Sequence, residues 1–302
     1  MGSLDLIFVT DTSGSLDGER KAIADGVDRF IEELPTDVDF RIGVILGHGS
    51  KSNHSGRLWH GSGQAVTMDS TRMSVRQIQN HLRAALTSGP GDSNSDGGEE
   101  MLYSFNKAIT TNLAENRRKG LFRTDAALAV IFISDENDIC SPGTVRDPDE
   151  QEPKAFARDC AGITPQSVLA AVKSLQGNRP FNLSAIAYTN PATVVRSGEN
   201  ELALGIVDLV KLANGFLADL ASRDFDRALA DIGKLTATKL ILKTEFKLTR
   251  TNVNAASIKV TVDGKPVAHV YQASINEVHI QAVDAGGLGS VVVITYSQNP
   301  GG

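Results

Sequence analysis

Short apolar runs alternate along most of the chain with stretches in which apolar residues recur every three or four positions. Continuous apolar runs of this length predict buried strands, and the second pattern predicts amphipathic helices. The predicted strands cover residues 4–9, 40–46, 64–68, 126–133, 181–188 and 216–220. The predicted helices lie at residues 23–34, 75–86, 101–113, 168–175, 202–212 and 225–235. This order predicts a doubly wound, Rossmann-like α/β fold with a mostly parallel six-stranded sheet, in which residues 40–46 and 64–68 form a hairpin.

The spacing of apolar residues changes near residue 236. Beyond it, apolar and polar residues alternate, as at Phe246 and Leu248 and again from Ile258 to Val262. Asp263-Gly264 is a typical hairpin turn. The pattern predicts two domains, an α/β domain at 1–236 and a small all-β, sandwich-like domain at 237–302. The second domain is expected either at the end of the sheet where the strands begin, as a stalk, or against its side as a brace.

Oxygen-bearing side chains gather in loops that follow predicted parallel strands. The loop Asp11-Thr12-Ser13-Gly14-Ser15 follows the first strand, and Asp135 follows the central one. A third polar loop, residues 92–98, precedes a helix and falls at the same edge. Ligands of open α/β sheets bind at the carboxyl ends of the strands, and hard divalent cations prefer oxygen ligands. The alternative is that Asp11 caps the helix while Ser13 and Ser15 bond only to loop amides.

These residues resemble the von Willebrand factor A (vWA) family, whose metal-ion-dependent adhesion site uses an Asp-x-Ser-x-Ser loop. Asp11, Ser13 and Ser15 match that loop, and Asp135 matches the distal aspartate of the family. The middle loop of the family usually supplies a threonine. The residues that could replace it here are Ser93, Ser95 and Asp96.

The resemblance covers residues 4–236. It implies a bound divalent cation, with Mg²⁺ first and Mn²⁺ or Ca²⁺ as alternatives. It also implies adhesion through an acidic group of a protein or glycan partner. Residues 134–138 followed by Cys140 resemble the exported bacterial branch of the family, which implies a secreted, periplasmic or cell-surface protein. No export signal stands in the sequence, and a removed one would leave no trace.

Composition excludes several other classes of function. The chain has 302 residues with 30 basic and 36 acidic side chains, so its formal net charge is −6. That charge argues against binding to a nucleic-acid backbone, and no apolar run is long enough for membrane insertion. The sequence has neither a phosphate-binding G-x-x-x-x-G-K-[ST] motif nor a G-x-S-x-G elbow, so no catalytic residue is assigned. A hydrolase using Ser13 is the enzymatic alternative, and it would need a histidine as its base.

Other candidate residues concern specificity and the cysteines. Cys140 and Cys160 are the only cysteines, and we expect a disulfide rather than two buried thiols. The insertion at 136–164, which starts at Glu136, is either a surface loop or a loop that selects the partner. His54 and Trp59, in the loop after the second strand, are further specificity candidates. The sequence contains His48, His54 and His60, and we expect a solvated hairpin loop there rather than a transition-metal site.

These observations predict a non-enzymatic adhesion protein with a cation-dependent site. The competing hypothesis is a structural or assembly component of a surface complex, in which the metal only stabilises the loops.

Overall fold

The structure, a computed structural model, describes residues 3–34, 38–90, 98–141, 152–194, 200–240, 244–281, 284 and 290–299. Its central sheet has seven strands in the described part of the chain, in the order β3-β2-β1-β5-β6-β7, with β4 also paired to β2. The strands are β1 (Ser3–Thr10), β2 (Asp39–Leu46), β3 (Leu58–Trp59), β4 (Met68–Asp69), β5 (Ala127–Ser134), β6 (Phe181–Ala187) and β7 (Phe216–Asp219). All are parallel except β3 and β4, which confirms the predicted mostly parallel α/β sheet.

The buried strands explain the continuous apolar runs. Successive side chains of a strand point to opposite faces, so a strand covered on both faces needs apolar residues at every position. In β1, Leu6 and Phe8 join the hydrophobic cluster on one face, whereas Ile7 and Val9 join the cluster on the other.

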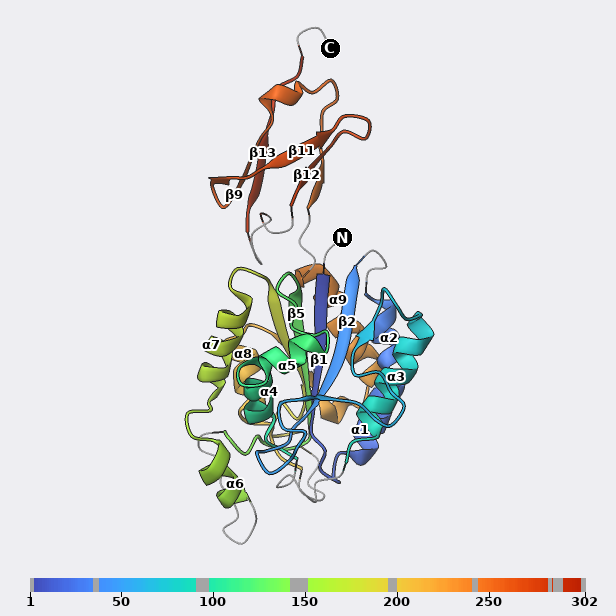
Figure 1. The fold of residues 1–302 in the computed structure, drawn as a ribbon, viewed down its shortest axis with the longest axis vertical. Helices are drawn as coiled ribbons and strands as arrows, with labels where there is room; N and C mark the ends of the chain where they lie inside the picture. Colours follow the sequence, from blue (N-terminus) through green and yellow to red (C-terminus); the bar gives the residue numbers. More distant parts are fainter. Residues whose placement is uncertain are drawn as a thin grey trace.

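Helices cover both faces of the sheet (Figure 1). One face carries α1 (Asp17–Asp25), α2 (Val27–Glu32), α3 (Val75–Thr87) and α9 (Phe225–Leu240). The other carries α4 (Met101–Ile109), α5 (Leu113–Arg118), α7 (Pro165–Gln176) and α8 (Ile206–Leu212). A short 3₁₀ helix, η2 (Leu220–Ser222), follows β7. No helix among the described residues is both long and apolar enough to cross a membrane.

Four local predictions are wrong. The strand expected at 64–68 is replaced by the two-residue strands β3 and β4, so the sheet has seven strands and not six; Gly63, at φ +72°, lies in the turns between them. The helix expected at 23–34 is divided at Gly26 into α1 and α2. The helix expected at 101–113 is likewise divided, into α4, which ends at Ile109, and α5, which begins at Leu113. The insertion at 136–164 contains a helix, α6 (Glu152–Asp159), whose buried Ala155 belongs to the core.

The C-terminal part has its own apolar cluster. It forms two three-stranded antiparallel sheets, β10-β9-β13 and β11-β12-β8. The strands are β8 (Glu245–Lys247), β9 (Lys259–Val262), β10 (Lys265–Pro266), β11 (His269–Gln272), β12 (Glu277–Ile280) and β13 (Val292–Thr295), with a 3₁₀ helix, η3 (Ala255–Ser257). Asp263 and Gly264 both have positive φ, as the predicted hairpin turn requires. In Figure 1 these sheets lie beyond the end where β1 begins, away from the loop that follows it. The domain boundary at residue 236 stays a prediction.

A buried ionic network lies at the end of the sheet where the strands begin. The Arg123 guanidinium contacts Asp5 at 2.8 Å and Asp39 at 2.6 Å. It also donates to the carbonyl oxygens of Leu4 and Asp39, each at 3.0 Å. Burial raises the pKa of Asp5, and the charge of Arg123 partly offsets that rise. Arg123 therefore joins β1, β2 and the segment before β5.

We predict that Arg123→Ala lowers the free energy of unfolding by about 3–5 kcal/mol, because it leaves the buried Asp5 carboxylate without its cation. Urea unfolding followed by circular dichroism measures this loss. The matched control is Arg72→Ala, which removes an arginine that is 80% exposed from its ion pair with Asp69 and should cost less than about 1 kcal/mol. Equal losses in the two variants would contradict the prediction.

Candidate metal centre

The loop after β1 places the Asp11 carboxylate in the interior. Asp11 is fully buried, and its Oδ1 accepts a hydrogen bond from the backbone N–H of Ser13 at 2.7 Å. Its Oδ2 accepts from the Ser134 hydroxyl at 2.9 Å. Arg20 donates to the Asp11 carbonyl oxygen at 3.0 Å. These bonds fix Asp11 against the end of β5, which carries the second part of the site.

Two serine hydroxyls lie side by side next to this carboxylate. The Oγ atoms of Ser13 and Ser15 are 2.9 Å apart, and the Ser15 hydroxyl donates to Oε1 of Glu136 at 2.9 Å. Ser13 is buried and Ser15 is half-buried. The first loop and the loop after β5 therefore meet directly through Ser15 and Glu136.

Asp135 has the most unusual environment of the group. Its side chain is 1% exposed, and neither carboxylate oxygen accepts a hydrogen bond of good geometry in the described structure. Buried carboxylates are normally hydrogen-bonded or bound to a cation, because an isolated buried charge costs several kcal/mol. Burial and the charge of Asp11 raise the pKa of Asp135 to about 7, although the nearby Ser15 hydroxyl lowers it. The donor set of Asp11, Ser13, Ser15 and Asp135 fits a hard divalent cation.

The structure adds Glu99, a residue that the sequence analysis missed. Glu99 precedes α4 and is 6% exposed. Its pKa lies well above the ordinary range because of burial first, followed by the charges of Asp11 and Glu136. Burial likewise raises the pKa of Asp11. The signal in the sequence is the acidic pair Glu99-Glu100, which lies directly before a predicted helix and next to the polar loop at 92–98.

The other middle-loop candidates, Ser93, Ser95 and Asp96, lie outside the described residues. Their roles therefore stay predictions.

Two glycines let the loops approach closely. A Cβ atom at Gly98, whose φ is +89°, would collide with the Thr12 hydroxyl, and one at Gly47 would collide with the carbonyl oxygen of Gly98. The backbone N–H of Gly47 donates to Thr10, and that of Glu100 donates to Gly47, each at 2.8 Å. The loop after β1, the loop after β2 and the segment before α4 are thereby joined by backbone hydrogen bonds.

His48 differs from the expected solvated hairpin. It is 2% exposed, its Nε2 lies 2.9 Å from the Thr12 hydroxyl, and its Nδ1 lies 2.8 Å from that of Ser52. Burial lowers the pKa of His48 to about 4, so the ring is neutral at pH 7. Both nitrogens are engaged, and Ser13 bonds to Ser15, so His48 is not placed to act as a base for Ser13.

The specificity candidates of the β2–β3 loop contact one another. The rings of His54 and Trp59 meet edge to face with centroids 4.8 Å apart, and Trp59 stacks on His60 at 6.4 Å. Trp59 also packs against the core cluster that contains α1 and α3. A role of His54 or Trp59 in specificity stays a prediction. Glu136, by contrast, lies within the candidate metal centre itself.

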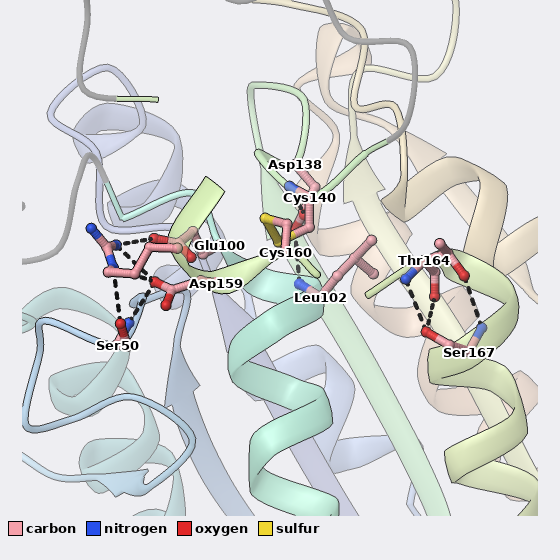
Figure 2. Close-up of a disulfide and its surroundings, with 10 residues drawn as sticks. Ser50, Glu100, Leu102, Asp138, Cys140, Asp159, Cys160, Thr164 and Ser167 are labelled. Carbon is pink, nitrogen blue, oxygen red and sulfur yellow. Dashed lines mark hydrogen bonds and ion pairs between the residues drawn. A yellow bond between two sulfur atoms is a disulfide. The ribbon is translucent and has the colours of Figure 1, made fainter. Parts of the chain in front are cut away.

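The expected disulfide is present between Cys140 and Cys160, and it connects the site loop to α6 (Figure 2). On one side, Asp138 accepts hydrogen bonds from the backbone N–H groups of Cys140 and Leu102, each at 2.8 Å. This ties the segment after Asp135 to the start of α4. Residues 142–151 of the insertion lie outside the described part of the chain.

On the other side of the disulfide, α6 is held by charged groups. Asp159 accepts from the backbone N–H of Ser50 at 2.8 Å and pairs with Arg158 at 2.7 Å. Arg158 also contacts the buried Glu100 at 3.4 Å. Burial, with the charge of Asp159, raises the pKa of Glu100 to about 9. The disulfide and these polar contacts together join the Asp135 loop, α4, α6 and the loop after β2.

The sheet order and the helices on both faces define a Rossmann-like α/β fold with a mostly parallel sheet. No family model and no curated protein matches the chain.

Solved structures similar to the chain include a von Willebrand factor type A protein from Catenulispora acidiphila, with 13% identity and a TM-score of 0.41 over 99% of this chain. The pilus adhesin SpaC from Lactobacillus rhamnosus GG has 15% identity and a TM-score of 0.43 over 98%. An aerotolerance-related membrane protein from Bacteroides fragilis has 12% identity and a TM-score of 0.36 over 76%. The matches span 59%, 38% and 97% of those three chains, so the first two proteins contain further parts.

We predict that opening the disulfide lowers the free energy of unfolding by about 3 kcal/mol, since it closes a loop with a sequence separation of 20 residues. Chemical unfolding with and without reductant measures the loss. The double variant Cys140→Ser/Cys160→Ser is the control, because reductant should not change its stability. Unchanged stability of the reduced protein would contradict a bracing role.

We also predict that Asp135 makes the metal-free protein less stable as the pH rises. Its folded-state pKa of about 7 exceeds the 3.8 of an aspartate in the unfolded chain, so between these values the folded state holds a proton that the unfolded state has released. In Asp135→Asn, the number of protons released on unfolding between about pH 4 and pH 7 should fall by up to about one. Chemical unfolding in chelator measures this slope. Asp231→Asn on α9 is the control, and equal slopes in wild type and Asp135→Asn would contradict the prediction.

Proposed function

We propose that the chain is a surface adhesion protein that binds its partner through a divalent cation held by Asp11, Ser13, Ser15 and Asp135. The observation that carries the proposal is the Asp135 carboxylate, which is buried beside a second carboxylate and two hydroxyls while neither of its oxygens accepts a hydrogen bond of good geometry from the described residues. Mg²⁺, Mn²⁺ and Ca²⁺ all suit oxygen donors. A bound cation supplies a coordination position for an oxygen atom of a partner, which the resemblance implies to be an acidic group of a protein or glycan.

The roles of the chain's own residues follow from their contacts. Ser134 and the Ser13 amide orient Asp11, and Arg20 holds the backbone of the same loop. Asp138 and the disulfide hold the segment after Asp135. The site is therefore preorganised for binding, and the proposal includes no catalytic step. The disulfide is also consistent with an oxidising location such as the cell surface or periplasm.

The first experiment measures the melting temperature in Mg²⁺, Mn²⁺, Ca²⁺ and chelator. At least one cation should raise the melting temperature of the wild type, because a ligand that binds only the folded state stabilises it. The same cation should leave the melting temperature of Asp135→Asn nearly unchanged. Asp231→Asn should respond like the wild type. The absence of any shift in the wild type would overturn the proposal.

The second experiment separates adhesion from a purely structural metal. Binding of the wild type to surfaces coated with candidate proteins or glycans should be lost in chelator and in Asp135→Asn. If the cation raises the melting temperature but chelator leaves surface binding unchanged, the metal only stabilises the loops, and the structural alternative is correct.

A further inference from the structure

The disulfide and a buried glutamate form a second group of metal-binding side chains, made of residues that the candidate metal centre does not use. One carboxylate oxygen of Glu100 and the Sγ atoms of Cys140 and Cys160 all lie within 4.8 Å of one another. Figure 2 shows the Glu100 side chain beside the two sulfur atoms. We propose that, in the thiol form of the chain, Cys140, Cys160 and Glu100 bind a Zn²⁺ ion that takes over the bracing role of the disulfide.

The fold keeps the two cysteines close together by contacts other than the disulfide. Both are thiols when the chain is synthesised, and they become thiols again when a reductant opens the bond. Their Cα atoms lie 4.9 Å apart. Asp138 accepts the backbone N–H of Cys140 at 2.8 Å, and the backbone N–H of Cys160 donates to the Phe156 carbonyl oxygen of α6 at 3.1 Å. The two thiols should therefore stay neighbours when the disulfide is absent.

Glu100 brings to this group a carboxylate oxygen that has no partner. Its side chain is completely buried. Arg158 contacts Oε1 at 3.4 Å, whereas Oε2 is buried without a hydrogen-bond partner among the described residues. Buried carboxylate oxygens are normally hydrogen-bonded or bound to a cation. Glu100 is thus an independent indication of a ligand beside the two sulfur atoms.

The donor set indicates which cation fits. Zn²⁺ is bound tetrahedrally by thiolate sulfur at about 2.3 Å and by carboxylate oxygen at about 2.0–2.2 Å, which places its ligand atoms about 3–4 Å apart. Rotation of the three side chains can bring their ligand atoms to such separations. Three protein ligands leave the fourth position to a water molecule. Mg²⁺ and Ca²⁺ prefer oxygen ligands, so this site and the candidate metal centre should select different ions.

Binding exchanges protons for the metal. Each thiol and the Glu100 carboxyl would lose one proton to the solvent, because Zn²⁺ is bound by the deprotonated groups. In the disulfide form Glu100 keeps its proton at pH 7, since burial and the charge of Asp159 raise its pKa to about 9 against the opposing charge of Arg158. Asp138 and Tyr103 are further titratable groups close to it. The three ionised ligands and Zn²⁺ would together carry one negative charge, which the Arg158 guanidinium faces.

The test measures Zn²⁺ binding to the whole chain by calorimetry, in the disulfide form and after reduction. A phosphine is a suitable reductant because it adds no thiols: it takes the oxygen of one water molecule, whose two hydrogens go to the two sulfurs. The thiol form should bind about one Zn²⁺ and release about three protons at pH 7, measured in buffers of different ionisation enthalpy. Cd²⁺ should give the ultraviolet absorption of thiolate-bound cadmium in the thiol form, and neither in the disulfide form nor in Cys140→Ser/Cys160→Ser.

Variants of the acids test the carboxylate ligand. In the thiol form, Glu100→Gln should bind Zn²⁺ at least about tenfold more weakly and release about two protons. Glu245→Gln on β8, whose carboxylate is 66% exposed, is the matched control and should bind like the wild type. Asp135→Asn should also bind Zn²⁺ like the wild type, because Asp135 belongs to the other site.

Melting of the thiol form tests the bracing role. Zn²⁺ should raise its melting temperature toward that of the disulfide form and should leave Cys140→Ser/Cys160→Ser unchanged. If circular dichroism shows the metal-free thiol form to be unfolded, Zn²⁺ should restore the fold.

Two outcomes would overturn the proposal. The first is a thiol form that neither binds Zn²⁺ nor is stabilised by it. The second is a Glu100→Gln variant that matches the wild type in affinity and in protons released. Neither outcome bears on the cation proposed for Asp11 and Asp135, which is tested in the disulfide form.

Discussion

Mutual repulsion between buried carboxylates is the constraint on which the site end of this molecule depends. Asp11, Glu99, Asp135 and Glu136 are each at most 6% exposed, yet they come from three separate segments. Burying like charges together is unfavourable unless protons or a cation compensate them.

The rest of the structure holds these acids where they repel one another. Gly47 and Gly98 allow the backbones of the loops to touch, and His48 bonds to the first loop through Thr12. The Cys140–Cys160 disulfide and Asp138 hold the segment after Asp135 against α4 and α6. Each of these contacts restricts the conformational freedom of a loop. The entropic cost of ordering the site is therefore met during folding and not on binding.

The sequence predicted the sheet and the first loop because both depend on local pattern. A strand buried on both faces requires a continuous apolar run, and the Asp11 loop is one contiguous motif directly after such a strand. Glu99 and the burial of His48 depend on contacts between residues that are 36 or more positions apart. No spacing along the chain encodes those contacts. The two short strands β3 and β4 were missed for a similar reason, since each is defined by its pairing with a different part of β2.

The arrangement in Figure 1 has a mechanical consequence. The loop of Asp11 follows the end of β1, whereas the C-terminal sheets lie beyond the end where β1 begins. Tension applied between a partner at the site and the C-terminal part would therefore run along the strands. The parallel pairs β1–β2 and β1–β5 would be loaded in shear, with their hydrogen bonds sharing the force, and not opened one at a time. The Arg123 network joins β1 and β2 at the end of these pairs that lies far from the site.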